Sequence, residues 1–224
     1  MSNINEEYVQ EYIRSLIPIK NDILMEVEKY AYDNHVPIIE KEVAQFLQVL
    51  LKIAKPTNIL EVGTAIGYSA IIMASSTDDY CKITTIERRQ DMVDLAKENL
   101  KKTGYLDKVN IMCGEAEDIL LKLKEKYDFI FLDASKGHYL KFFNRCVDLL
   151  NDGGIIMADN VLYKGMVASD KLIVRRKKTI VKRMRKYLEY IHNIDGYKSC
   201  VIPIGDGISL TYKEVKDICT NQNC

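Results

Sequence analysis

The chain has 224 residues and a formal net charge of zero, with 47% hydrophobic and 29% charged residues. These values are typical of one globular domain with a well-buried core, and they exclude a disordered chain. No apolar run reaches the roughly 18 residues of a membrane-spanning helix, so we expect no membrane partner. The start, MSNINEEYVQEY, is acidic and polar, and the six cysteines form no CxxC pair. Both features favour a reducing, cytoplasmic setting.

The first 55 residues have the periodicity of helices. Apolar residues recur at helical spacing over about 6–16, again around residues 23–30, and in a third segment that starts near Glu40. Pro18 and Pro37 follow the first two segments and end them. The sequence therefore predicts a helical extension over residues 1–55.

Short β-branched or aromatic runs then alternate with helical stretches such as 91–102 and 137–150. The expected strands are NILEV (58–62), KITTIE (82–87), KVNIM (108–112), YDFIFLD (127–133) and GIIMAD (154–159). This alternation is typical of parallel βαβ units in which helices cover both faces of the sheet.

The end of the chain has a different pattern. The segments YKSCVIPI and GISLTYK flank a Gly-Asp-Gly turn at 205–207, which is typical of an antiparallel hairpin. We find no internal repeat and no Gly/Ser-rich linker. We therefore expect residues 56–224 to form one α/β core, a doubly wound, mostly parallel seven-stranded sheet with a C-terminal hairpin. With the helical extension, residues 1–224 form a single domain.

A glycine-containing loop follows the first expected strand, in ILEVGTAIGYSA (59–70). Because Gly63 has no Cβ, the backbone there can approach a ligand closely, although a purely structural glycine turn is the alternative. Glu87 ends the second strand, where a carboxylate can accept hydrogen bonds from both ribose hydroxyls. Gly114 and Glu115 end the third strand and would border an adenine. Three successive strand ends thus favour a nucleoside-binding site.

The spacing of this loop separates two kinds of cofactor. Dinucleotide-binding folds use GxGxxG, which brings a pyrophosphate to a helix N-terminus. Here the spacing is Gly63-Thr-Ala-Ile-Gly67, with Ala65 where many methyltransferases have a glycine. S-adenosylmethionine carries no phosphate, so the looser loop suits it. We predict an S-adenosylmethionine site.

Polar residues also end the fourth and fifth strands. Asp133 lies in FLDASKGHY (131–139), and Asp159 and Asn160 lie in MADNVLYK (157–164). Both strand ends would face the crevice that holds the cofactor. Each aspartate alone is more simply explained as a cap of the following helix. Together with the amide of Asn160 they are hard ligands suited to Mg²⁺ or Mn²⁺, which can lower the pKa of a hydroxyl group.

Lys136 lies three residues after Asp133, at the mouth of the same crevice. A partly desolvated lysine beside a metal can lose its proton and act as a general base. An exposed lysine at the start of a helix is an equal alternative. His138 and His192 have no metal-ligand spacing such as HxxxH, and we predict that they are structural or surface residues.

Positive charge is concentrated between residues 164 and 188, which contain ten Lys or Arg and one acid, a net of +9, so the remainder carries −9. An amphipathic helix is expected over residues 171–191. Its apolar side carries Ile173, Ile180, Met184, Tyr187, Leu188 and Ile191, and its basic side carries Arg175, Lys178, Lys182, Arg185 and Lys186. A solvated basic face is the simpler explanation. Beside the crevice of an otherwise acidic protein, however, this side favours a phosphate-binding surface.

Several motifs together resemble a known family. EVGTAIGYSA, the acidic end of KITTIER, FLDASKGHY, MADNVLYKG and the VIPIGDGISL hairpin are similar to cation-dependent class I O-methyltransferases, which include catechol and caffeoyl-CoA enzymes. The similarity covers nearly the whole chain after residue 35. It implies a homodimer, which the N-terminal helices would support. The roles that it implies are metal binding by Asp133, Asp159 and Asn160, catalysis by Asp133 and by Lys136 as the base, and S-adenosylmethionine contacts from Ile39, Ser69, Glu87, Gly114, Glu115 and Asp133.

Within that family, ADNVLYKG and the basic helix resemble the bacterial tRNA 5-hydroxyuridine methyltransferases, which convert wobble hydroxyuridine to methoxyuridine. This subgroup implies tRNA as the partner, bound near its anticodon by residues 171–190, and no DNA. Bases of a single-stranded loop can be splayed out and inserted into a pocket. Methylation of small catechol-like phenols is the alternative, and a non-catalytic RNA-binding protein on this fold is a third hypothesis. The insertion with which plant enzymes hold a CoA-linked substrate is not recognisable.

Overall fold

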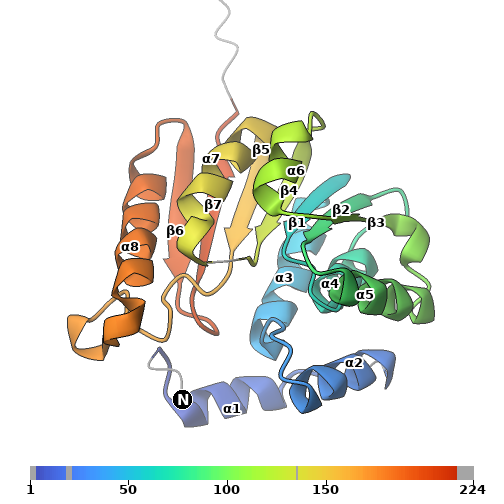
Figure 1. The fold of residues 1–224 in the computed structure, drawn as a ribbon, viewed down its shortest axis with the longest axis horizontal. Coiled ribbons are helices and arrows are strands. Elements are labelled where there is room, and N and C mark those ends of the chain that lie inside the picture. Colours follow the sequence, from blue (N-terminus) through green and yellow to red (C-terminus); the bar gives the residue numbers. More distant parts are fainter. Residues whose placement is uncertain (1–3, 19–21, 135, 216–224) are drawn as a thin grey trace, which may run out of the picture.

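The computed structural model describes residues 4–18, 22–134 and 136–215, and its strands form one seven-stranded sheet (Figure 1). The strand order is β3-β2-β1-β4-β5-β7-β6. The strands that pair in parallel are β1 (Asn58–Val62), β2 (Lys82–Glu87), β3 (Val109–Cys113), β4 (Tyr127–Leu132) and β5 (Leu150–Ala158). β6 (Tyr197–Ile202) and β7 (Ile208–Lys213) form the antiparallel hairpin at one edge. The predicted fold class is confirmed.

The strand order reverses between β1 and β4. From β1 the chain proceeds outward to β2 and β3, and then returns to β4 and β5 on the other side of β1. Ligands bind at such a switch point, at the carboxyl ends of the strands. Val62 is paired with Leu132, so the residues that follow them, Gly63 and Asp133, come to lie side by side.

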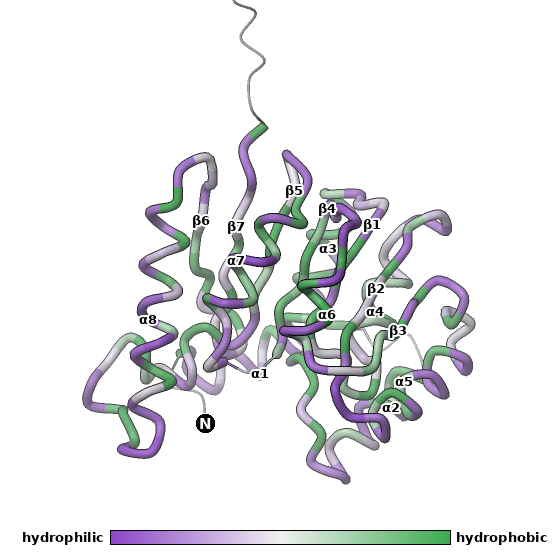
Figure 2. Tube along the Cα trace, turned by 45° about the horizontal axis from the view of Figure 1, so that its top comes forward, coloured by the Kyte–Doolittle hydropathy of each residue, from purple (hydrophilic) through white to green (hydrophobic). Residues whose placement is uncertain are grey.

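Helices cover both faces of the sheet. α3 (Lys41–Ala54), α4 (Tyr68–Ser76) and α5 (Gln90–Lys102) pack on one face, and α6 (Ala116–Lys122), α7 (Tyr139–Leu149) and α8 (Lys178–Asn193) pack on the other. Successive side chains of a strand point to opposite faces, so Ile59 belongs to the first core and Leu60 to the second. In Figure 2 the central strands are largely hydrophobic, whereas the helices alternate between hydrophobic and hydrophilic residues.

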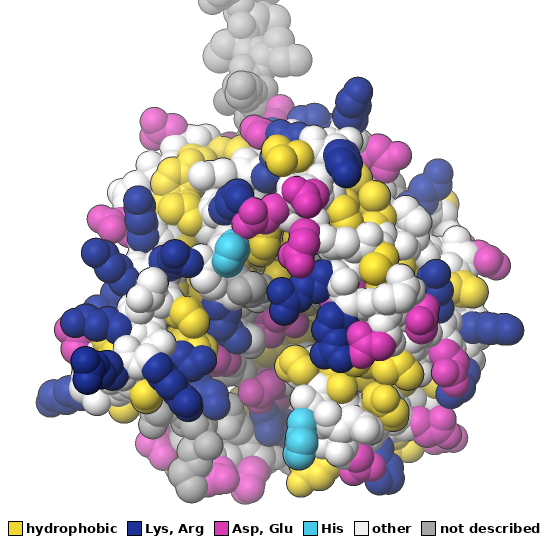
Figure 3. Space-filling model, in the orientation of Figure 1, with side chains coloured by type: hydrophobic (Ala, Val, Ile, Leu, Met, Phe, Trp, Pro, Cys, Tyr) yellow, Lys and Arg dark blue, Asp and Glu magenta, His cyan; other side chains and the backbone are white. Residues whose placement is uncertain are grey.

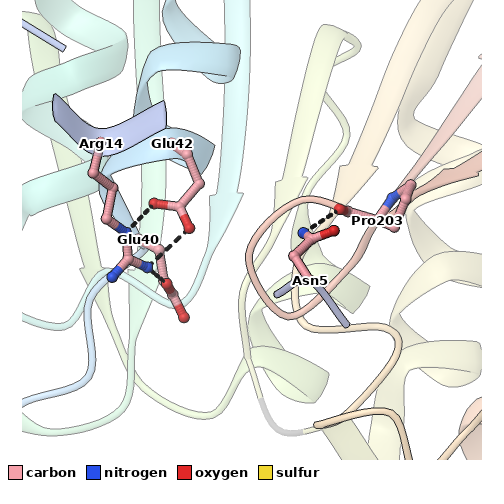
Figure 4. Close-up of polar contacts among 5 residues, drawn as sticks. All are labelled: Asn5, Arg14, Glu40, Glu42 and Pro203. Atoms are coloured by element: carbon pink, nitrogen blue, oxygen red, sulfur yellow. Dashed lines mark hydrogen bonds and ion pairs between the residues drawn. The ribbon is translucent and has the colours of Figure 1, made fainter. Parts of the chain in front are cut away.

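The N-terminal extension contains α1 (Glu7–Ser15) and α2 (Asp22–Asp33), which precede α3. α1 has no buried residue, and polar contacts hold it in place (Figure 4). Arg14 Nε donates to Glu42 at 2.7 Å and its guanidinium also pairs with Glu40, while Asn5 donates to the Pro203 carbonyl at 2.7 Å. The extension therefore contacts both the start of α3 and the β6–β7 turn.

The basic segment, residues 164–188, differs from the sequence prediction. α8 begins only at Lys178, and the residues before it form short 3₁₀ turns at Asp170–Leu172 and Arg175–Lys177. The predicted helix over 171–191 was therefore wrong in its first part. The physical reason is the β-branched pair Ile173 and Val174, which adopts extended backbone angles between the two turns.

Two further observations concern the described ranges. Across 4–18, 22–134 and 136–215, no helix is both long and apolar enough to cross a membrane. The four cysteines of these ranges, Cys81, Cys113, Cys146 and Cys200, are free thiols. Cys219 and Cys224 lie outside the described residues.

Candidate functional site

A cavity of about 720 Å³ lies at the carboxyl ends of the parallel strands, and Figure 3 shows this face hollowed near its centre. Residues that end or follow each of the five parallel strands form part of the wall of this cavity. These residues include Gly63, Glu87, Gly114, Glu115, Asp133, Lys136 and Asn160. The end of α2 adds a side that the sequence did not predict, formed by Tyr30, Asn34 and His35.

The loop after β1 lies directly against the end of β4. Gly63 has φ +108°, and a Cβ there would lie 2.1 Å from the carbonyl oxygen of Asp133. No residue other than glycine fits this position without a shift of the backbone. Ala65 has φ +45°, a conformation that costs energy for a residue with a Cβ. The loop therefore keeps, at Ala65, the backbone shape that glycine would favour.

Glu87 is held in a fixed orientation at the cavity wall. Its Oε2 accepts a hydrogen bond from the Ala65 amide at 3.0 Å, and its Oε1 accepts one from the Arg89 amide at 2.9 Å. Each carboxylate oxygen has further lone pairs. Glu87 can thus fix the loop after β1 and still accept hydrogen bonds from ribose hydroxyls.

The two other predicted cofactor contacts, Ile39 and Ser69, line a small neighbouring pocket. This pocket shares Gly63, Ala65 and Asp133 with the large cavity. The structure therefore brings all seven predicted cofactor residues around two pockets with a common wall.

Glu61 is a buried carboxylate of β1, to which the sequence analysis assigned no role. It is fully buried and accepts hydrogen bonds from the hydroxyls of Ser69 and Thr85. Burial raises the pKa of Glu61 to about 7, the two hydrogen bonds oppose this shift, and the charges of Asp133 and Glu87 add to it. The only sequence signal was an acidic residue inside an apolar strand.

The predicted metal ligands converge at the ends of β4 and β5. Asp159 is buried, and its Oδ1 accepts a hydrogen bond from the Asn160 amide at 2.6 Å. Burial, and after it the charge of Asp133, raise the pKa of Asp159 to about 8. Burial also raises the pKa of Asp133 to about 6, against the opposing effect of the Lys136 charge. Two neighbouring carboxylates that are difficult to ionise together favour added positive charge.

This set of donors fits a hard divalent cation. Two carboxylates and the amide oxygen of Asn160 are the oxygen ligands that Mg²⁺ prefers, with water or substrate completing the set. The ammonium of Lys136 donates to Asn160 Oδ1 at 2.6 Å, so a cation already lies at this edge. Within the described ranges, no group of three or more His, Cys, Asp or Glu side chains could hold a metal. The amide oxygen of Asn160 would be the third protein donor of the set, beside the two carboxylates.

Tyr163 connects this centre with the basic segment. Its side chain is buried, and the Nζ atoms of Lys136 and Lys177 lie 5.5 and 5.8 Å from the centroid of its ring. Such distances are typical of cation–π contacts. Tyr163 belongs to the MADNVLYKG motif, but no pattern in the sequence indicates that two cations lie over its ring.

The backbone before Tyr163 is held by the β6–β7 turn. The Val161 amide donates to the Gly207 carbonyl at 2.8 Å, and the Leu162 amide donates to the Asp206 carbonyl at 3.1 Å. A Cβ on Gly207 would lie 2.4 Å from Leu162 Cγ. The position of Tyr163 is therefore determined by the hairpin at the edge of the sheet.

The basic side chains of α8 and its preceding turns are not all available to a ligand. Arg185 pairs with Asp170 at 2.7 Å and donates to the Val167 carbonyl at 2.8 Å. The other four predicted cations are exposed, and none forms an ion pair with the described residues: Arg175, Lys178, Lys182 and Lys186. Figure 3 shows dark blue side chains gathered on one flank of the hollow.

The two histidines have other contacts. His138 Nδ1 lies 2.7 Å from Glu117, and His192 Nδ1 lies 2.7 Å from the Leu188 carbonyl. Both are exposed and neither lines the cavity. The prediction that they are structural or surface residues is confirmed.

Comparison with known proteins gives consistent matches. The family model described as O-methyltransferase matches residues 15–214. Caffeoyl-CoA O-methyltransferase 1 of Eucalyptus globulus is 34% identical over 176 residues, covering 74% of this chain and 70% of that protein. A catechol O-methyltransferase of Niastella koreensis is 34% identical over 176 residues, covering 76% of this chain and 80% of that protein.

A solved structure agrees with these matches. The O-methyltransferase of Bacillus cereus, in complex with SAH, superposes with a TM-score of 0.82 at 27% identity, covering 92% of this chain and 97% of that one. The sequence matches span most of the chain, and the fold places the shared motifs around one cavity. The chain therefore belongs to the class I O-methyltransferase family that includes the caffeoyl-CoA and catechol enzymes.

Proposed function

We propose that this chain transfers the methyl group of S-adenosylmethionine to the 5-hydroxyl oxygen of wobble hydroxyuridine in cytoplasmic tRNA. The observation that carries the methyl transfer is the convergence of the seven predicted cofactor residues, Asp133 among them, with Lys136 and Asn160 around two adjoining pockets. The buried carboxylate of Asp159 accepts a hydrogen bond from the Asn160 amide. The family to which the chain belongs supports the same chemistry.

In this proposal, different residues of the large cavity bind the cofactor and the acceptor. Glu87 accepts hydrogen bonds from the ribose, and Gly114 and Glu115 border the adenine. The close approach of Gly63 to the Asp133 carbonyl brings the cofactor loop against the end of β4. The cofactor and the acceptor oxygen are thus held at adjoining strand ends, which lowers the entropy cost of their reaction.

Lys136 is the base in this proposal. Its Nζ lies at the cavity wall, 2.6 Å from Asn160 Oδ1. In its neutral form this nitrogen takes the proton of the acceptor hydroxyl, the oxygen forms the new bond to the methyl carbon, and the sulfonium leaves as a thioether. Asp133, Asp159 and Asn160 would hold Mg²⁺ or Mn²⁺, which lowers the pKa of the acceptor hydroxyl when bound.

Charge and exposure support an RNA substrate. The segment 164–188 carries a net +9 in a chain of zero net charge. Seven of its cations are exposed and without ion pairs among the described residues: Lys171, Arg175, Arg176, Lys178, Lys182, Arg183 and Lys186. A phosphate backbone is attracted to such a surface through counterion release, while a splayed loop base enters the cavity. A small neutral phenol, by contrast, has no phosphate for the basic segment to bind.

A second candidate is the methylation of small catechol-like phenols. The observation that favours it is the 34% identity to the Niastella koreensis catechol O-methyltransferase, of which this chain covers 80%. Both candidates use the same residues for methyl transfer. They differ only in whether the basic segment contributes to substrate binding.

The test compares the two acceptors directly. Purified protein, S-adenosylmethionine and Mg²⁺ are incubated with tRNA that contains 5-hydroxyuridine, and separately with catechol, and the products are measured by mass spectrometry. We expect methoxyuridine to form at a far higher kcat/KM than methylated catechol. The reverse order would establish the phenol reaction, and RNA binding without any methyl transfer would establish the non-catalytic hypothesis. A reaction mixture with EDTA is the control for metal dependence.

A further inference from the structure

Lys177 differs from the other cations of the basic segment. Its neighbours Arg175, Arg176 and Lys178 are exposed, whereas Lys177 is partly buried. Its ammonium lies over the ring of Tyr163 at 5.8 Å. Among the residues that the structure describes, no carboxylate forms an ion pair with it. Lys177 is thus directed from the basic segment toward the catalytic centre.

The ring of Tyr163 sets the distance between two cations. Lys136 Nζ lies 5.5 Å from its centroid and Lys177 Nζ lies 5.8 Å from it, so the two nitrogens are no more than about 11 Å apart, the sum of these distances. Lys136 Nζ marks the place of the reacting hydroxyl. A separation within this upper limit is compatible with the reach of a single nucleotide, from the edge of its base to its phosphate.

The spacing is part of a rigid arrangement. Tyr163 follows two residues whose amides donate to the β6–β7 turn, and the Lys164 amide donates to Asp206. The Lys177 amide in turn donates to the Val174 carbonyl at 2.7 Å, which closes the turn before α8. These hydrogen bonds fix the backbone that carries Tyr163 and Lys177, while Lys136 Nζ is held by its hydrogen bond to Asn160 Oδ1.

Of the two cations over Tyr163, only Lys177 has no carboxylate beside it among the described residues. Asp206 faces Lys136 and Lys164, but no carboxylate pairs with Lys177. A cation–π contact compensates a partly buried ammonium only in part. An anionic group bound at Lys177 would complete the arrangement.

We propose that Lys177 binds a phosphate attached to the very nucleotide whose base is methylated, on its 5′ or its 3′ side. The exposed cations around it then hold phosphates further along the strand. The protein thereby selects an acceptor by the distance between its hydroxyl and its own phosphate, a group that a phenol or a free nucleoside lacks. This inference rests on the proposed RNA substrate.

The test is a double-mutant cycle between Lys177 and single phosphates. Its substrate is an anticodon stem-loop RNA with 5-hydroxyuridine, in which one flanking phosphate at a time is replaced by a neutral methylphosphonate. Lys177→Gln should lower kcat/KM for the unmodified RNA about tenfold, the scale of one charged hydrogen bond. With the wild-type protein, kcat/KM should fall by the same factor on one of the two methylphosphonate RNAs. With that RNA, Lys177→Gln should cause no further loss.

Two variants serve as controls. Lys171→Gln removes a cation of the same segment that is not over Tyr163, and its effect should multiply with that of either methylphosphonate. Lys177→Arg keeps the charge and should restore most of the activity on unmodified RNA. Thermal denaturation of each variant verifies that the fold is intact.

The outcomes distinguish this inference from the proposed function. One outcome is that Lys177→Gln lowers kcat/KM by the same factor on both methylphosphonate RNAs as on the RNA with all its phosphates. In that case Lys177 binds neither phosphate and the inference is wrong. If the wild-type protein does not methylate the unmodified RNA at all, the proposed function is wrong, and the inference is overturned with it.

Discussion

Asp159 lies buried beside a second carboxylate, so its replacement should have opposite effects on stability and on activity. In EDTA, Asp159→Asn removes a charge that burial disfavours, and the melting temperature at pH 8 should rise above that of the wild type. Methyl transfer should be lost, because the variant lacks a predicted metal ligand.

Thermal denaturation with EDTA and with Mg²⁺ checks this prediction. Mg²⁺ should raise the melting temperature of the wild-type protein and leave that of the variant nearly unchanged. An equal rise in both proteins, or full activity of either in EDTA, would mean that the metal site lies elsewhere.

Glu61 gives the stability of the protein a specific pH dependence. Burial raises its pKa in the folded state from 4.5 to about 7, so the folded state binds the proton more tightly than the unfolded state. The stabilisation of the folded state by this proton is complete below about pH 4.5 and is lost as the pH rises through 7. Glu61→Gln imitates the protonated form, so the unfolding free energy of the variant relative to wild type should grow by about 3 kcal/mol between pH 4.5 and 8.

Urea denaturation at several pH values measures this difference. Glu11→Gln, at an exposed position of α1, is the matched control and should leave the pH profile unchanged. A Glu61→Gln profile parallel to that of the wild type would show that Glu61 is ionised throughout.

The site residues that the sequence predicted share one property, which is that they end parallel strands. Gly63, Glu87, Asp133 and Asp159 follow or end apolar runs, and the topology of a doubly wound sheet then brings them together. The roles of Tyr163 and Lys177 could not be predicted, because they arise from contacts across the fold. Both cations over Tyr163 come from other segments, and no local pattern encodes that.

At the scale of the element, the strands were predictable where they are continuous apolar runs. β1 and β2 have the predicted bounds. β5 begins at Leu150 instead of residue 154, because Leu150 pairs with Tyr127 of β4 across a register shift. The predicted helix over 171–191 begins late because extended backbone at Ile173 and Val174 interrupts it. In both cases a boundary depended on tertiary pairing or on a short β-branched pair.

The loop between β1 and α4 provides a test of close backbone approach. Gly63→Ala would place a Cβ 2.1 Å from the Asp133 carbonyl oxygen, whereas Gly104, at φ +77°, has no atom within 4 Å of the equivalent position. Gly104→Ala should therefore cost only the conformational strain of about 1–2 kcal/mol. Gly63→Ala should destabilise the protein by more than that and also weaken S-adenosylmethionine binding.

Urea denaturation and titration calorimetry separate the two effects. Gly104→Ala should bind the cofactor as the wild type does. Equal stability losses in the two variants would mean that the approach of the loop to β4 is loose enough to absorb a methyl group.

At the scale of the whole molecule, charge is separated between the basic segment and the remainder of an electrically neutral chain. Exchanging Arg175, Lys178 and Lys182 for Glu should raise the KM for tRNA strongly and leave activity on any small acceptor nearly unchanged. If each cation neutralises one phosphate, the slope of log affinity against log salt should become shallower by about 2.

A second triple variant controls for net charge. Lys52, Lys97 and Lys101 are exposed on α3 and α5, and exchanging them for Glu changes the charge equally. Tight, salt-dependent tRNA binding by the first variant would contradict the proposed surface. The homodimer stays a prediction.

The contacts of α1 have a consequence for the dynamics of the protein. Because this helix buries no residue, the guanidinium of Arg14 and the amide of Asn5 supply much of what attaches it to the core. A helix held in this way opens by local unfolding while the sheet stays folded. In hydrogen exchange, the amides of α1 should therefore exchange orders of magnitude faster than those of β1 and β4, and Arg14→Ala should accelerate the amides of α1 alone.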